Sequence, residues 1–337
     1  MSDKRYLGNI MTDAPTAPAG PYQDSAASGV WSLQEAFTYT KAGLWPTAGN
    51  AAQKAIFAGG EYNNPINNAI SIINMNSTGN GSDFGDMTVG HHKPACAAST
   101  TRALMAGGYT ESSRTNVIEY IAFATLGNAA DFGDLTVARG SGMGSCGSST
   151  RGVFTGGEAP YATNIMDYST IASTGNASDF GDLTSARNNI MGGCSNGTRG
   201  ITSVGGYTGS AAVNTIDYIT IASTGNAADF GDTLTATFQY GAASNSTRGL
   251  VTKGLVIEYI TIATTGNSID FGDGLTNRGD AVSAASPVNY LIGGSGVSTT
   301  NLAFVVISTL GNAVDFGDLP QSASGSGAIS DCHGGLA

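Results

Sequence analysis

The chain has 337 residues, enough for one large domain or two, and 41% of them are hydrophobic, enough for a buried core. Its net charge of −11 argues against binding to duplex nucleic acid and against docking on an anionic membrane, since both need a basic surface. No apolar run approaches the roughly 18 residues of a membrane span, and the first 22 residues lack the apolar core of a signal peptide. We therefore expect neither a nucleic-acid nor a membrane partner.

Residues 1–50 differ in composition from the rest of the chain and predict an N-terminal arm ahead of a domain at 51–337. Residues 1–24 are rich in Pro, Ala, Asp and Thr, which is typical of an extended linker without its own core. Further on, Ser32 is followed three residues later by Glu35, a capping box that predicts one small helix from Leu33 to about Lys41.

The two tryptophans of the chain, Trp31 and Trp45, flank this helix. Together with Phe37 and Tyr39 they are candidate anchor residues, through which the arm would attach to another protein. The alternative is that both tryptophans pack on the side of the following domain, and the sequence favours neither interpretation.

The rest of the chain is dominated by an octet, Gly-Asn-x-x-Asp-Phe-Gly-Asp, that occurs six times. The copies begin at Gly79, Gly127, Gly175, Gly225, Gly266 and Gly311, at spacings of 48, 48, 50, 41 and 45 residues. Periods of about 40–50 residues are typical of β-propeller blades, each of which is a sheet of four strands. The sequence therefore predicts an all-β, six-bladed propeller.

Counting strands predicts how the ring closes. The chain enters on a second strand near Lys54 and leaves on a first strand, so the segment from Gly325 to Asp331 should complete the blade begun at Lys54. This closure would remove open sheet edges that favour aggregation. The first strands are expected to begin near Gly90, Arg139, Arg187, Thr237, Gly279 and Ser324. The fifth repeat, from Arg248, lacks a double glycine and its loop, so a tight turn should join its second and third strands.

The repeat resembles the kelch repeat over about residues 54–337. The shared features are a double glycine after the second strand, a tyrosine in the third and an arginine after the fourth. The glycine pairs start at Gly59, Gly107, Gly156, Gly205 and Gly293, the tyrosines are Tyr120, Tyr168, Tyr218 and Tyr259, and the arginines are Arg139, Arg187 and Arg278. Kelch blades carry Trp where this chain has Phe84, Phe132, Phe180, Phe230, Phe271 and Phe316.

The segment SGVWSLQEAFTYTKAGLWPTAG resembles segments of bacteriophage tail fibre and appendage proteins, and the D-F-G-D unit resembles repeats of phage structural proteins. This resemblance implies a virion protein, assembled in the host cytoplasm, whose arm binds other virion proteins. The propeller would then contact a host surface glycan or protein, or a neighbouring virion protein. Its long loops between second and third strands suit recognition, because loops on a rigid scaffold often carry function. The sequence leaves open whether the chain forms a homo-oligomer.

Two other function classes remain as alternatives: a cellular kelch-type protein-binding adaptor and a glycan-active propeller enzyme. An adaptor usually carries a further recruiting domain. An enzyme needs a convergent acid, base or nucleophile, and the sequence offers no such cluster, so we expect no enzymatic activity. The six D-F-G triplets lack the other motifs of a kinase. The three histidines, His91, His92 and His333, do not suggest a metal site.

The aspartates of the octets invite a calcium interpretation. Asn128, Asp131 and Asp134 of one repeat, or Asp179 and Asp182 of the next, could supply oxygen ligands. Structural use is the favoured interpretation, with Asn and Asp hydrogen-bonding to turn backbone or pairing with repeat arginines. We therefore expect no cofactor, and calcium stays the alternative.

The four cysteines are predicted to be free thiols. Cys96, Cys146 and Cys194 fall at the same place in consecutive first strands, which line a propeller's channel, and Cys332 lies near the C-terminus. Equivalent atoms on adjacent blades are too far apart for a disulfide, which needs Cα atoms within about 7 Å.

Overall fold

The computed structural model describes Gln34, Thr38 and residues 53–60, 66–294, 300–322 and 324–336. Contacts group the chain from Lys54 onward into one compact unit. Gln34 and Thr38 are helical, and the Thr38 hydroxyl donates to the Gln34 carbonyl at 2.8 Å, as in the predicted small helix. The rest of the predicted arm, with Trp31, Phe37, Tyr39 and Trp45, lies outside the described residues.

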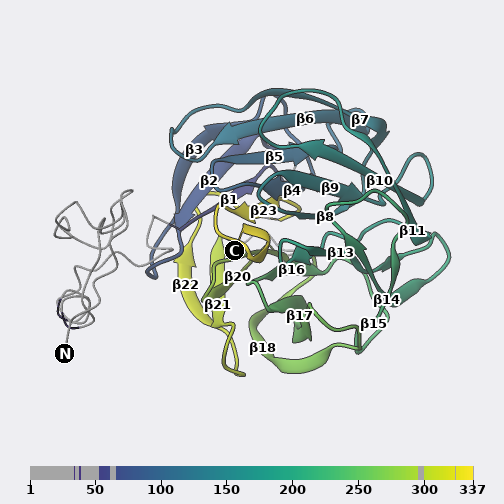
Figure 1. The fold of residues 1–337 in the computed structure, drawn as a ribbon. Coiled ribbons are helices and arrows are strands. Elements are labelled where there is room, and N and C mark those ends of the chain that lie inside the picture. The colour runs from purple at the N-terminus through teal and green to yellow at the C-terminus, as the bar shows by residue number, and fades with distance from the viewer. Residues whose placement is uncertain are drawn as a thin grey trace, which may run out of the picture. The chain divides into compact units, whose positions relative to one another are not determined.

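Six antiparallel sheets stand in a ring around a central axis, which confirms the predicted six-bladed propeller (Figure 1). The innermost strands are β4 (Ala95–Ala98), β8 (Gly144–Gly147), β12 (Cys194–Ser195), β16 (Gly241–Ser244), β19 (Val282–Ala285) and β23 (Gly327–Ser330). The second strands are β1 (Lys54–Ala58), β5 (Arg102–Ala106), β9 (Arg151–Thr155), β13 (Arg199–Tyr207), the first half of β17 (Arg248–Thr261) and β20 (Asn289–Gly293).

The third and fourth strands complete each blade. The third strands are β2 (Ala69–Asn74), β6 (Thr115–Ala122), β10 (Thr163–Thr170), β14 (Ala212–Thr220), the second half of β17 and β21 (Asn301–Val306). The outermost strands, which carry the octets, are β3 (Ser82–Asp86), β7 (Ala130–Arg139), β11 (Ser178–Arg187), β15 (Ala228–Asp232), β18 (Ile269–Arg278) and β22 (Val314–Asp318). A short 3-10 turn, η2 (Gly334–Leu336), follows β23.

The ring closes as predicted. Strand β23 pairs antiparallel with β1, with Ile329 opposite Ile56, so the two ends of the propeller share the first blade (Figure 1). The expected starts of two inner strands were wrong, because Arg139 and Arg187 end the outer strands β7 and β11, and the inner strands begin at Gly144 and Cys194. From that position the guanidinium of Arg139 or Arg187 reaches a carboxylate on the next blade.

The fifth blade has the predicted tight turn. Its strand β17 pairs through its first half with β16 and through its second half with β18. The Ile262 amide donates to the Thr247 carbonyl at 3.0 Å, so the two ends of β17 meet. The strand therefore folds back on itself near Gly254, whose φ of +64° suits glycine.

The octets form a continuous rim around the propeller, with the same three hydrogen bonds at every joint between blades. Between the second and third blades, the amides of Gly175 and Ala177 donate to the carbonyls of Phe132 and Asp134, both at 2.7 Å. The Asp134 amide donates to the Asn176 side-chain oxygen at 3.1 Å. The bonded Asp and Asn pairs at the other joints are Asp86 and Asn128, Asp182 and Asn226, Asp232 and Asn267, Asp273 and Asn312, and Asp318 and Asn80.

A second closed circle lies at the starts of the second strands. There a side chain of each blade donates to a carbonyl beyond the third strand of the next blade. The pairs are Lys54 and Phe123, Arg102 and Ile171, Arg151 and Ile221, Arg199 and Ile262, Arg248 and Ile307, and Asn289 and Met75. Each of the four arginines also lies 4.3–4.6 Å from the ring centroid of its own blade's repeat tyrosine, a cation–π contact.

Buried carboxylates join some blades but not all. Asp167 of the third blade is fully buried and pairs with Arg139 of the second at 2.6 Å, while the Thr136 hydroxyl donates to it at 2.6 Å. Asp217 makes the equivalent contacts with Arg187 and Thr184 at the next joint. Such pairs are costly to break, because removal of one partner leaves an uncompensated buried charge.

The hydrophobic core lies between neighbouring blades rather than within them. Phe132 of the second blade, 2% exposed, packs in one cluster with Phe154 of the third, which is fully buried. Within the described residues, no helix has the length and apolar character that a membrane crossing requires.

Candidate functional site

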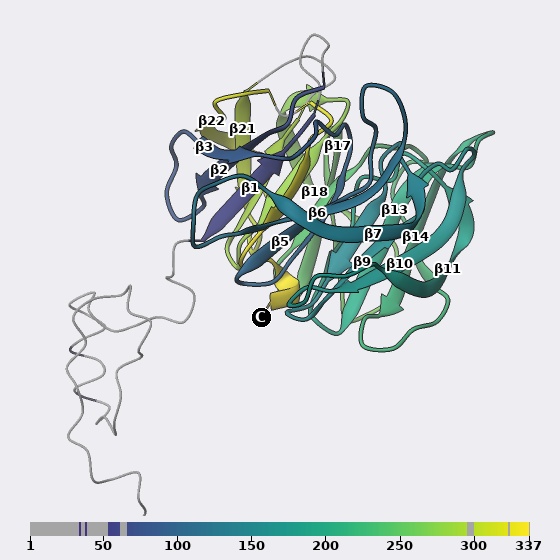
Figure 2. The same ribbon diagram turned by 90° about the horizontal axis from the view of Figure 1, so that it is seen from above.

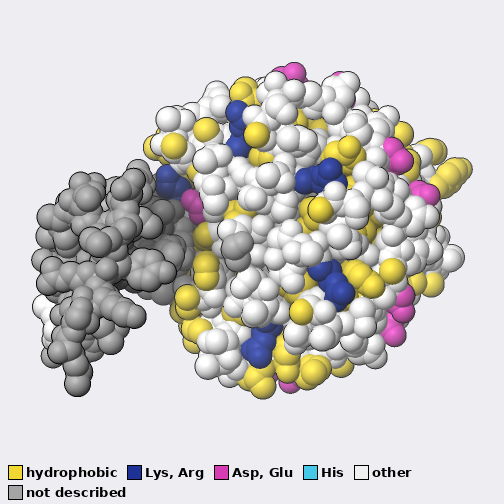
Figure 3. All heavy atoms as spheres, in the orientation of Figure 1, with side chains coloured by type: hydrophobic (Ala, Val, Ile, Leu, Met, Phe, Trp, Pro, Cys, Tyr) yellow, Lys and Arg dark blue, Asp and Glu magenta, His cyan; other side chains and the backbone are white. Residues whose placement is uncertain are grey.

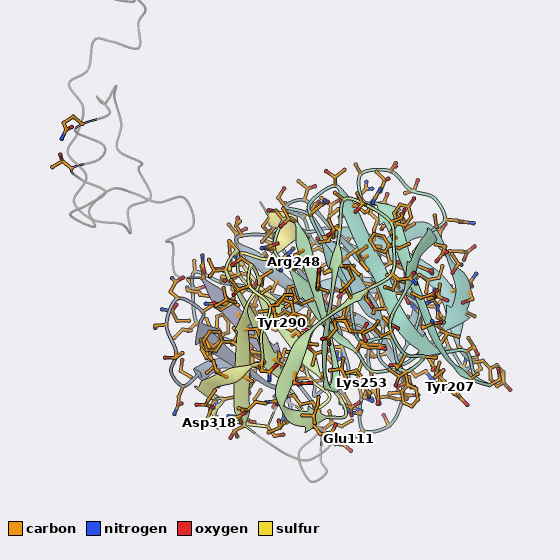
Figure 4. The ribbon with its side chains drawn as sticks, turned by 90° about the horizontal axis from the view of Figure 1, so that it is seen from below. Glu111, Tyr207, Arg248, Lys253, Tyr290 and Asp318 are labelled. Atoms are coloured by element: carbon orange, nitrogen blue, oxygen red, sulfur yellow. The ribbon has the colours of Figure 1, made fainter. Side chains whose placement is uncertain are left out.

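The propeller has two different faces, which an edge-on view separates (Figure 2). Arg248 of the second circle lies near one face, close to the C-terminus, whereas Lys253, Tyr207 and Glu111 lie near the other (Figure 4). We call the first the C-terminal face and the second the loop face. On the C-terminal face, basic side chains are spaced around the centre rather than gathered (Figure 3), which agrees with their use at successive joints.

The central channel is narrowed at the C-terminal face by the chain's own end. The His333 imidazole Nε2 lies 3.0 Å from the Ala98 carbonyl, and its Nδ1 accepts a hydrogen bond from the Gly335 amide at 3.1 Å. This pattern fits a neutral ring, and burial lowers the pKa of His333 to about 4. The cavity along the axis is small, about 40 Å³, and room for one water takes roughly 10–15 Å³.

At the loop face, the channel mouth is bordered by residues in the left-handed backbone region. Lys93, Ser141, Asn189 and Gln239 have φ values of 51–65° although none is a glycine. Main-chain hydrogen bonds hold them, from Asn189 to the Ser141 carbonyl at 2.6 Å and from Gln239 to the Asn189 carbonyl at 2.7 Å. Left-handed non-glycine residues cost free energy and gather at functional sites, which makes the mouth the candidate site.

Lys93, Asp280 and Lys253 lie close together at this mouth. The Lys93 ammonium is 3.2 Å from the Asp280 carboxylate, and the Lys93 residue is buried. The Lys253 ammonium donates to the Gly279 carbonyl at 2.5 Å and lies 3.5 Å from the Gln239 side-chain oxygen. Burial lowers the pKa of Lys253, Asp280 opposes this effect and Lys93 adds to it.

Aromatic rings stand beside the lysines. The Lys253 ammonium lies 5.5 Å from the Phe238 ring centroid, and Phe238 meets Tyr207 edge to face at 5.8 Å. Both rings are half-buried. Polar groups and partly accessible aromatic faces in one place are typical of ligand sites. One feature of the sequence points to this site, the double glycine that is missing from the fifth repeat.

The aspartates proposed as calcium ligands lie on the outer strands. Asp131 and Asp179 are exposed, whereas Asp134 and Asp182 are half-buried. The Asn128 side-chain oxygen accepts a hydrogen bond from the Asp86 amide of the preceding blade. In the described parts of the chain, no three His, Cys, Asp or Glu side chains are grouped to hold a metal ion. The repeat asparagine thus bonds to backbone as expected, although across the joint and not within its own turn.

The remaining sequence candidates separate in space. His91 is buried, and His333 lies at the C-terminal end of the channel. All four cysteines are free, as predicted, and Cys96, Cys146 and Cys194 line the channel. Burial raises the pKa of Cys96 and Cys194 to about 12, so these thiols are unreactive near neutral pH.

Comparison with protein-family models gives no match to this chain, and a search of curated proteins gives none either. The propeller fold is compatible with a binding or structural role, and the geometry above is the basis for choosing between such roles.

Proposed function

We propose that the chain is a structural protein of a bacteriophage virion, a tail fibre or appendage component, whose propeller contacts the host surface or a neighbouring virion protein. The observation that carries the proposal is that one part of the propeller repeats from blade to blade and another part varies. The rim and the C-terminal face repeat the same joint contacts from blade to blade, whereas the residues at the loop-face mouth differ at each blade. A rigid scaffold with variable loops is the usual architecture of recognition proteins.

The resemblances in sequence support the finer part of the proposal. The Trp31–Trp45 segment and the D-F-G-D unit resemble phage structural proteins, and the repeat glycines, tyrosines and arginines resemble kelch blades. Under this proposal, residues 1–50 bind other virion proteins, and the propeller is displayed on the particle surface.

The test is to locate the protein in particles. Antibodies against the propeller should label intact virions in electron microscopy at a fixed place on the tail or capsid. A variant lacking residues 1–50 should keep the melting temperature of the ring but be absent from purified particles. Unlabelled particles would overturn the virion assignment, and incorporation of the shortened protein would overturn only the anchoring role of the arm.

A further inference from the structure

The fifth blade differs from the others at the loop face. Gly241 pairs with Thr252 as Gly144 pairs with Thr155, so Lys253 stands at the position that Gly156 occupies in the third blade. Elsewhere this position is the first of two glycines that lead into a loop, whereas here Lys253 is followed at once by the turn at Gly254. The short blade therefore places a lysine side chain where other blades have a loop.

The charge of Lys253 is not neutralised by the described residues around it. Its ammonium contacts a carbonyl oxygen, an amide oxygen and an aromatic ring, but forms no ion pair with any carboxylate that the structure describes. Asp280, the described carboxylate that acts on Lys253, pairs with Lys93. Glu158, which accepts a hydrogen bond from Ser141 at the mouth, pairs with Arg114. Among the described residues, the Lys253 ammonium is thus left without a carboxylate of its own, in a chain whose net charge is −11.

The surroundings of this charge favour one kind of ligand. A half-buried cation without a counter-ion is unfavourable, and an incoming anion would compensate it. A single ammonium matches a carboxylate better than a phosphate dianion, which proteins commonly hold with clustered arginines. The rings of Phe238 and Tyr207 offer apolar surface, and the Gln239 amide group offers hydrogen-bond donors for hydroxyl groups.

We propose that Lys253, Gln239, Phe238 and Tyr207 form a site for the carboxylate of an acidic saccharide, which we call the Lys253 site. The proposal rests on the proposed role in surface recognition and names the class of ligand for it. Lys93 acts beside the site by occupying Asp280, which would otherwise compete with the ligand for Lys253.

The experiment uses the full-length protein and titration calorimetry with trigalacturonate as probe. The acid should bind, and its methyl ester, which has the same rings without charge, should bind at least tenfold more weakly. Lys253→Gln should also lose at least tenfold in affinity, about 1.4 kcal/mol, while Lys253→Arg retains binding. Arg199→Gln removes an equal charge from the C-terminal face and should bind like the unchanged protein.

Several results would overturn the proposal. Equal binding of acid and ester would exclude recognition of the carboxylate, and equal binding by the unchanged protein and Lys253→Gln would exclude Lys253. Acetate that binds as tightly as trigalacturonate would exclude the saccharide. If antibodies locate the protein on virions but trigalacturonate does not bind to it, this site is rejected and the virion role stands. If trigalacturonate binds but the antibodies label no particle, the site is supported and the virion role is rejected.

Discussion

The rim and the axis of this propeller are built in opposite ways. At the rim, six octets make the same three hydrogen bonds at all six joints, and glycine, asparagine and aspartate recur at fixed positions. At the loop-face mouth, consecutive blades present Lys93, Ser141, Asn189 and Gln239 in the same left-handed conformation. The difference shows which residues specify the ring and which are free to specify a ligand.

The largest expected effect comes from breaking the rim. Gly133 has φ +147°, and a Cβ there would overlap the Gly175 carbonyl of the next blade. Gly133→Ala should therefore cost on the order of 3 kcal/mol, from backbone strain plus overlap, and lower the melting temperature by roughly 6 °C or more. Calorimetry of the purified protein measures the shift.

The matched control is Gly127→Ala, because Gly127 has nearly the same φ, +149°, but nothing within 4 Å of the added Cβ. It should cost about 1 kcal/mol, the strain alone. Equal shifts in melting temperature in the two variants would show that the contact across the joint is not the reason for a glycine at position 133.

The sequence predicts the rim better than the axis, for a physical reason. Blade number, closure and the short fifth blade follow from residues that recur, because each joint needs the same backbone geometry. The partner of Asn176 could not be predicted, since the Asp134 amide belongs to another blade 42 residues away. Asp167 also looks like an ordinary strand residue until the fold brings Arg139 against it. The lysine of the Lys253 site lies in the fifth repeat, the one that lacks the double glycine and its loop.

A second prediction concerns the C-terminal end of the axis. The folded protein holds His333 neutral, with its pKa lowered by burial to about 4, whereas the unfolded chain binds a proton near the usual value of 6.5. The contribution of His333 to the free energy of unfolding is therefore fully present above pH 6.5. It is lost as the pH falls toward 4, by about 3 kcal/mol over that window. Denaturant unfolding between pH 7 and pH 4 measures this loss.

The informative quantity is the slope of the free energy of unfolding against pH between pH 7 and pH 4. His333→Gln removes this titration but leaves every other group in place, including buried His91, whose pKa burial also lowers. The variant should have a shallower slope in the same window, whatever its stability at pH 7. An unchanged slope would mean that His333 already accepts a proton in the folded ring.

The smallest expected effect tests whether the main chain alone sets the mouth. Asn189 has φ +51°, and its amide and carbonyl hold Ser141 and Gln239. Because a Cβ costs about 1–2 kcal/mol in this conformation and glycine pays none of it, Asn189→Gly should be about 1 kcal/mol more stable than Asn189→Ala in denaturant unfolding. If the two variants were equally stable, the main-chain hydrogen bonds would not hold position 189 in the left-handed conformation once the Asn189 side chain is gone. A mouth shaped by main-chain hydrogen bonds can exchange its side chains without losing its form, which is the property that a recognition surface on a fixed ring requires.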